Sequence, residues 1–339
     1  MARRISGTAW NKALMRAWSN TAKAAARAGT KAVAKALKNA PAAVKAKPAA
    51  PRNATKADWS SGAAFGVTGV RRYRLYKPPG LYYSERLPLV VMLHGCGQNA
   101  EAFAHCTRMN RLAASQRFLV LYPEQDRTAN AQNCWNWFDT RTGRARREAE
   151  SIDAAIDHVC LLYPVDRDRI VLAGLSAGAS MAALMATQRP ARYRAIAMHS
   201  GVPPGSAHSS ASAMAAMRGR RIAELPPPTG AKLPPLLVIH GQADHVVAPL
   251  NGKQAAQSWA SREDARPCPP RIIRRGSRYP ATITDYRVRG RVAVTLCEVH
   301  GLGHTWSGGA AGQAYSDTRG PDACAMIWSF AKRQFAPAA

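Results

Sequence analysis

Residues 174–178 of the chain read GLSAG, a short pattern that could place a nucleophile. The pattern matches G-x-S-x-G, in which a tight turn from a strand into a helix leaves no room for side chains at the two glycines. The segment Arg169–Ala173 before it is predicted to be a strand, and Ala179–Gln188 after it a helix. Since this is the context that the pattern requires, Ser176 is the candidate nucleophile.

A nucleophilic serine needs a base, and the base needs a carboxylate that holds its tautomer. Asp244 comes a short turn after the apolar segment Leu236–Ile239, where a carboxylate would lie at the end of a strand. Asp264 and Asp285 are less well placed, and Asp317 follows the expected base. We therefore predict that Asp244 is the orienting acid.

The predicted base is His304, which follows the last expected strand, Val292–Val299. Its neighbouring glycines suit a loop that reaches the edge of a sheet. His300, four residues earlier, remains the alternative. The chain order of serine, acid and histidine is the order found in α/β-hydrolases.

Cleavage of an acyl bond also requires two backbone donors for the oxyanion. The first predicted donor is the amide of Ala177, directly after the nucleophile. The second is the amide of Cys96, in the loop that follows the apolar segment Leu87–Leu93. This role uses the N–H group, so the thiol of Cys96 is not required, and a cysteine nucleophile is not favoured.

The elements that must position these groups alternate between apolar runs and helical patterns. Strands that are apolar throughout and alternate with helices predict an α/β fold with a mostly parallel sheet covered on both faces. Residues 203–233 break the rhythm and are predicted to be an insertion or lid. The expected strands are Tyr73–Tyr76, Leu87–Leu93, Phe118–Tyr122, Arg169–Ala173, Arg194–Met198, Pro235–His240 and Val292–Val299, and the expected helices include Ser151–Leu162, Ala179–Gln188 and Ala323–Gln334.

The charge of the chain is uneven. The formal net charge is +28 over 339 residues, and residues 1–57 contain many Lys and Arg but no Asp or Glu. We predict a basic, Ala/Lys-rich arm over 1–57 and a catalytic domain over 58–339. Such an arm is expected to attract an anionic polymer or granule surface. No transmembrane segment and no standard secretory signal peptide are expected.

Several motifs together resemble the esterase/polyhydroxybutyrate (PHB) depolymerase family. They are LHGCGQN at residues 93–99, CWNWF at 134–138, DRDRI at 166–170, GLSAG at 174–178 and GHTW at 303–306. The resemblance covers roughly Gly69–Phe335. It implies an α/β-hydrolase fold, the triad Ser176, Asp244 and His304, and chemistry without a metal or organic cofactor.

The same resemblance implies a substrate class. Members cleave short-chain polyhydroxyalkanoate esters or similar carboxylic esters, and Trp135, Trp137 and Trp306 are predicted to line the acyl groove. A feruloyl or acetylxylan esterase is the alternative. A protein that binds granules or nucleic acid through its arm is an alternative of another class. The resemblance favours an extracellular protein, whereas the lack of a standard signal peptide favours a cytoplasmic or granule-associated one.

Overall fold

The structure is a computed structural model that describes residues 58–225 and 232–335. The arm predicted for 1–57, and with it the alternative of a binding protein, lies outside the described residues. Among the described residues, no helix has both the length and the apolar character needed to cross a bilayer.

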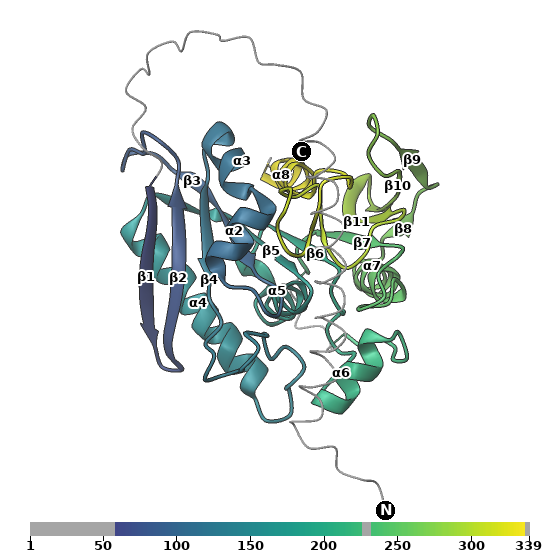
Figure 1. The fold of residues 1–339 in the computed structure, drawn as a ribbon, viewed down its shortest axis with the longest axis horizontal. Helices are drawn as coiled ribbons and strands as arrows, with labels where there is room; N and C mark the ends of the chain where they lie inside the picture. Colours follow the sequence, from purple (N-terminus) through teal and green to yellow (C-terminus); the bar gives the residue numbers. More distant parts are fainter. Residues whose placement is uncertain (1–57, 226–231, 336–339) are drawn as a thin grey trace, which may run out of the picture.

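A single large sheet runs through the molecule (Figure 1). Its strand order is β1-β2-β4-β3-β5-β6-β7-β11-β10-β8, with β9 also paired to β10. The bounds of these strands are β1 (Asp58–Gly66), β2 (Gly69–Lys77), β3 (Leu87–Leu93), β4 (Leu119–Pro123), β5 (Val165–Leu175), β6 (Ala195–His199), β7 (Leu236–Gly241), β8 (Arg266–Pro267), β9 (Arg271–Ile273), β10 (Ala281–Val288) and β11 (Arg291–Val299). The short pair β12 (Trp306–Ser307) and β13 (Ser316–Asp317) forms a second sheet.

The sheet is parallel where the predicted chemistry is located. The strands β4, β3, β5, β6, β7 and β11 pair in parallel, whereas β1, β2, β8, β9 and β10 pair antiparallel at the two edges. This arrangement confirms the predicted α/β fold with a mostly parallel sheet. Because the carboxyl ends of parallel strands meet at one edge, the loops after β3, β5, β7 and β11 can reach a common site.

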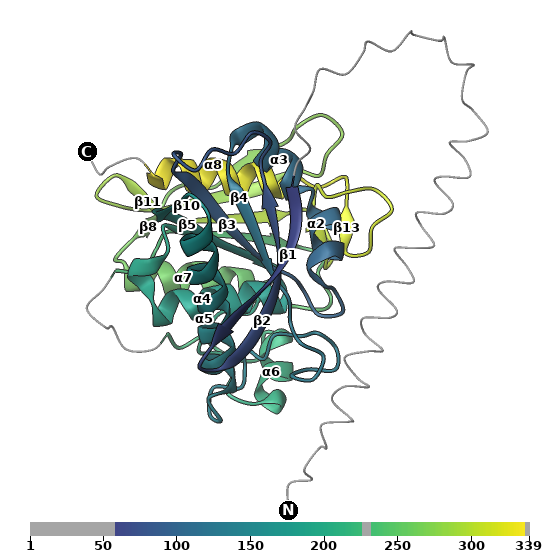
Figure 2. The same cartoon turned by 90° about the vertical axis from the view of Figure 1, so that its left-hand side faces the viewer.

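Helices cover both faces of the sheet (Figures 1 and 2). The helices α4 (Arg144–Leu162), α5 (Ala177–Gln188) and α7 (Leu250–Arg262) lie on one face, and α2 (Ala100–Thr107), α3 (Met109–Gln116) and α8 (Ala323–Phe335) on the other. Strand β3 shows why both faces must be covered: Leu89 and Val91 pack on the first side, and Val90 and Met92 on the second. Each such fully buried side chain stabilises the fold by about 1.5–3 kcal/mol.

The expected lid region contains a helix, α6 (Ser210–Met217), between β6 and β7. Ser209 caps it by accepting a hydrogen bond from the Ser212 amide. The helix projects from the body on the side of α5 and α7 (Figures 1 and 2). It thereby contributes residues to the cavity described next.

Candidate active site

Ser176 lies at the tight turn between β5 and α5. Its backbone has φ 56° and ψ −119°, a conformation that side-chain-bearing residues rarely adopt. A Cβ at Gly178 would lie 2.1 Å from the Leu93 carbonyl oxygen, and one at Gly174 would lie 2.4 Å from the Gly178 backbone. The two glycines therefore let the elbow pack against β3, and the Ser176 amide donates to the His199 carbonyl at 2.8 Å.

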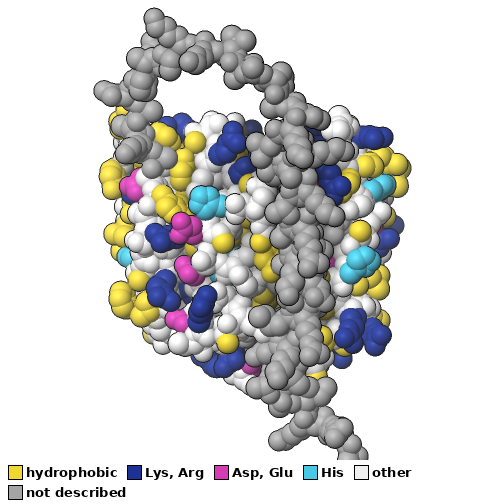
Figure 3. Space-filling view, in the orientation of Figure 1, with side chains coloured by type: hydrophobic (Ala, Val, Ile, Leu, Met, Phe, Trp, Pro, Cys, Tyr) yellow, Lys and Arg dark blue, Asp and Glu magenta, His cyan; other side chains and the backbone are white. Residues whose placement is uncertain are grey.

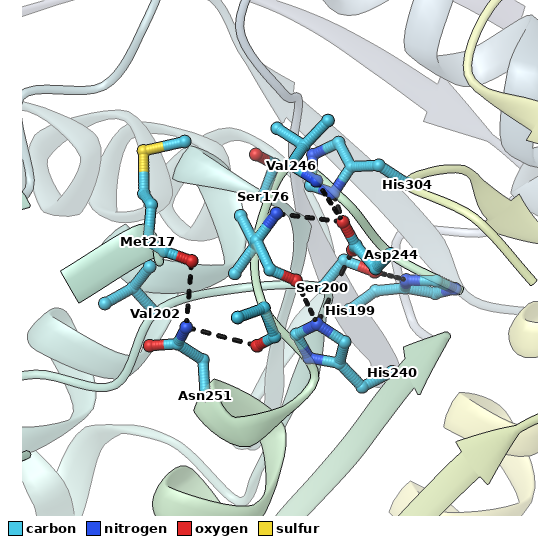
Figure 4. A network of polar contacts seen from close by, with 12 residues as sticks. Ser176, His199, Ser200, Val202, Met217, His240, Asp244, Val246, Asn251 and His304 are labelled. Atoms are coloured by element: carbon cyan, nitrogen blue, oxygen red, sulfur yellow. Dashed lines mark hydrogen bonds and ion pairs between the residues drawn. The ribbon is translucent and has the colours of Figure 1, made fainter. Parts of the chain in front are cut away.

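The structure brings Asp244 and His304 together from the loops after β7 and β11 (Figure 4). Oδ2 of Asp244 accepts a hydrogen bond from Nδ1 of His304 at 2.7 Å. Oδ1 accepts two more, from the amides of Val246 at 2.9 Å and Val247 at 2.8 Å. Burial alone would raise the pKa of Asp244, but the neighbouring His304 and His240 rings hold it well below its usual range. The buried carboxylate thus stays ionised beside the imidazole.

The alternative residues from the sequence lie elsewhere. His300 pairs through Nε2 with the Thr282 hydroxyl at 2.8 Å. Asp285 accepts hydrogen bonds from Arg271 and Thr295, both at 2.7 Å. These contacts give each residue a structural role outside the Asp244–His304 pair.

The loop after β3 is joined by a disulfide to the segment that precedes α4. Cys96 and Cys134 are bonded, with Cα atoms 4.2 Å apart. The Gly97 amide donates to the Gln132 carbonyl at 2.8 Å, and Trp135 Nε1 donates to the His94 carbonyl at 3.0 Å. The backbone around Cys96, the second predicted oxyanion donor, is therefore tied to its surroundings on several sides.

A cavity that is partly open to solvent brings the predicted nucleophile and both predicted oxyanion donors to one surface. Its walls are otherwise mostly apolar. The lining residues are Cys96, Cys134, Trp135, Trp137, Phe138, Ser176, Ala177, Ser180, Val202, Ala213, Met217 and Val247. None of these carries a formal charge, so the cavity suits a neutral, largely apolar acyl group.

Two of the three predicted groove tryptophans, Trp135 and Trp137, line this cavity. Trp306 does not, contrary to the prediction. Trp306 and Trp135 are both fully buried, but the Trp306 ring stacks on His199 with ring centroids 5.0 Å apart and makes an edge-to-face contact with Phe103. Trp306 therefore packs between Phe103 of α2 and His199 of β6.

Other site residues were missed by sequence reasoning. Ala213 and Met217 come from α6, whose chain position gives no indication that it faces β5. His199 ends β6 and is fully buried, and burial, followed by the nearby His240 and His304, lowers its pKa to about 3. It therefore adds no positive charge at neutral pH.

The disulfide yields a prediction for stability and activity. Replacing Cys134 by alanine should lower the free energy of unfolding by about 4 kcal/mol, because the bond closes a loop with a sequence separation of 38. It should also lower kcat by about tenfold or more, since the Cys96 amide is less firmly placed. Urea unfolding and ester turnover measure the two effects. Cys268→Ala, at a free cysteine, is the control. Unchanged turnover in Cys134→Ala would show that the loop keeps its geometry without the bond.

Comparisons with known proteins identify esterases among the relatives of the chain. Poly(3-hydroxyalkanoate) depolymerase C of Paucimonas lemoignei is 31% identical over 223 residues, which cover 60% of this chain and 53% of that protein. The chain thus spans about half the length of that relative. Feruloyl esterase B of Neurospora crassa is 28% identical over 212 residues, or 57% of this chain and 70% of that protein.

Solved structures show the same fold. Acetyl xylan esterase from Aspergillus awamori superposes with a TM-score of 0.60 at 20% identity, covering 72% of this chain and 94% of that one. The family model of the esterase PHB depolymerases matches residues 71–262, more than half of the chain. This match confirms the resemblance carried by the sequence motifs, and the chain belongs to the esterase PHB depolymerase family, whose members are carboxylic ester hydrolases with the α/β-hydrolase fold.

Proposed function

We propose that the chain hydrolyses carboxylic esters through an acyl-enzyme formed on Ser176. The observation that carries the proposal is the buried hydrogen bond between Asp244 and His304, drawn in Figure 4 together with the elbow serine, whose backbone amide donates to the carbonyl of the neighbouring His199. Ser176 itself opens onto an apolar cavity. A buried carboxylate that fixes an imidazole near a strained serine turn is the arrangement that activates a hydroxyl nucleophile.

The proposed reaction has two steps. His304 accepts the proton of Ser176 as the hydroxyl attacks the ester carbonyl, and the amides of Cys96 and Ala177 stabilise the oxyanion. The alcohol leaves with a proton from His304. Water then attacks the acyl-enzyme with the help of the same base, which releases the acid and restores Ser176.

We propose short-chain polyhydroxyalkanoate esters or oligomers as the substrate. Support comes from the depolymerase relative and from the apolar cavity walls, which offer no charged partner to an acyl group. A feruloyl or acetylxylan-type ester is the second candidate, because the feruloyl esterase matches over 70% of its own length.

Release of 3-hydroxybutyrate from amorphous PHB tests the substrate. The protein is first shown to react with a fluorophosphonate, which reports a competent nucleophile whatever the substrate. We expect release by the labelling-competent protein and none by Ser176→Ala. If competent protein releases no 3-hydroxybutyrate but cleaves acetyl or feruloyl esters, the polyester assignment is wrong and the second candidate replaces it.

A further inference from the structure

We propose that His240, at the end of β7, is a positioning residue that fixes the turn carrying Asp244. The inference rests on the proposed function, since it gives His240 a role in the same triad. His240 does not face the reacting atoms. It acts through the backbone of the 244–247 turn and through the carboxylate that this turn presents.

The Asp244–Val247 turn is held at one residue, Val247, through both its N–H and its C=O group. The Val247 amide donates to Oδ1 of Asp244 at 2.8 Å. The Val247 carbonyl lies 3.0 Å from Nε2 of His240. Because a carbonyl oxygen can only accept, Nε2 must carry the proton in this contact. The Asp244 carboxylate and the His240 imidazole thus both bind the backbone of Val247.

The same N–H group also lies near the carboxylate itself. Nε2 of His240 is 3.5 Å from Oδ2 of Asp244, the oxygen that accepts from His304. At this distance the contact is mainly that of an N–H dipole with a negative charge, since the proton is shared with Val247. Two rings therefore place N–H groups beside one carboxylate oxygen, one from β7 and one from the loop after β11 (Figure 4).

The ring of His240 is seated tightly. It is 1% exposed, and a Cβ at Gly252 of α7 would lie 2.9 Å from its Nδ1 and Cβ atoms. Within the described part of the chain, Nδ1 of His240 has no hydrogen-bond partner. A proton there would be buried without an acceptor, so Nε2 is the nitrogen that donates.

The charged and titratable groups around the ring come from several elements. Asp244 lies beside the ring in the turn after β7, and His304 contacts the same Asp244 oxygen from the loop after β11. His199 comes from β6. Glu298 of β11 lies opposite His240 in the pairing of β11 with β7. Its Oε1 atom lies 3.4 Å from Nζ of Lys253, which belongs to α7. The carboxylate of Asp244 is thus the negative group beside Nε2, and Glu298 already has a partner.

Two amide substitutions separate positioning from packing. In His240→Gln the side-chain nitrogen is as many bonds from Cα as Nε2, so a donor can still reach the Val247 carbonyl. In His240→Asn the amide is one bond shorter and cannot. We expect His240→Gln to retain kcat/KM within about threefold, and His240→Asn to lose about tenfold.

The dependence of kcat/KM on pH distinguishes a positioning role from a packing role, because a loss of packing alone would not shift it along the pH axis. Without the N–H of His240, more of the Asp244 charge acts on the protonated His304 ring, so the acid limb of kcat/KM should move to higher pH. We expect this displacement in His240→Asn and not in His240→Gln. If both variants keep the wild-type acid limb and differ only in Tm, His240 is a packing residue and the proposal is wrong.

A second variant keeps the test decisive if His240→Asn does not fold. Gly252→Ala keeps the His240 side chain but adds a methyl group that would displace its ring. Gln257→Ala, on the exposed side of α7, is the control that leaves the ring undisturbed. We expect the displaced acid limb only in Gly252→Ala, and an undisplaced limb would overturn the proposal. Wild-type protein that neither labels with fluorophosphonate nor turns over esters would instead reject the proposed function, so the two failures are distinguishable.

Discussion

Replacing Ser176 by alanine should lower kcat for a simple ester such as p-nitrophenyl acetate by about 10⁴–10⁶-fold. The change removes the only oxygen on which the proposed acyl-enzyme can form. The remaining rate would come from the oxyanion donors and the cavity, which still bind the substrate. Steady-state hydrolysis measures the loss, and labelling by a fluorophosphonate should disappear with it.

The fold should tolerate this substitution, because alanine fits wherever serine does and the elbow is held by the Gly174 and Gly178 contacts. Tm should therefore change little. Ser329→Ala, on the exposed side of α8, is the matched control and should retain both turnover and labelling. Turnover of Ser176→Ala close to that of the wild type would remove the nucleophile from its proposed role.

Asp244→Asn should lower kcat by about 10⁴-fold with little change in side-chain volume. An asparagine amide can present an N–H to Nδ1 of His304 and favour the wrong tautomer of the base. The loss should persist at every pH at which the wild type is active, because the pKa of Asp244 lies well below its usual range and its carboxylate remains ionised there.

The Asp244 carboxylate should also make the free energy of unfolding depend on pH. A carboxyl group with a lowered folded-state pKa contributes stability above its unfolded pKa, and this contribution is lost as the pH falls. The free energy of unfolding of Asp244→Asn should therefore fall less steeply than that of the wild type as the pH is lowered. Asp285→Asn is the matched control, since Asp285 is also buried and accepts from Arg271 and Thr295. It should lose stability but keep turnover; the reverse pattern would identify Asp285 as the acid.

The parts of this molecule that depend on local sequence could be predicted. Strand β3 was predicted with its observed bounds, because seven consecutive buried residues leave a continuous apolar run. The tight turn at Ser176 could also be predicted from the sequence. Side chains at its two glycines would clash with backbone a few residues away and with β3, so glycine is required at both positions. The short strands β8 and β9, largely exposed, carry no such pattern and were missed.

Features that depend on distant pairings could not be predicted. The Cys96–Cys134 bond joins two loops with a sequence separation of 38, and nothing local selects that pair among seven cysteines. Trp306 was predicted to line the acyl groove with Trp135 and Trp137, but in the structure its ring stacks on His199, which is distant in the chain.

The cavity draws its residues from chain segments of two kinds. Ser176 and Ala177 belong to the β5–α5 elbow, and Val247 to the turn after β7, both fixed by the sheet. Trp137 and Phe138 come from the connection between β4 and α4, and Ala213 and Met217 from that between β6 and β7. Connections tolerate replacement better than strands. Evolution or an engineer can therefore exchange residues of these two connections to change which acyl groups are accepted, provided that Cys134 is kept, because its bond to Cys96 holds a predicted oxyanion donor.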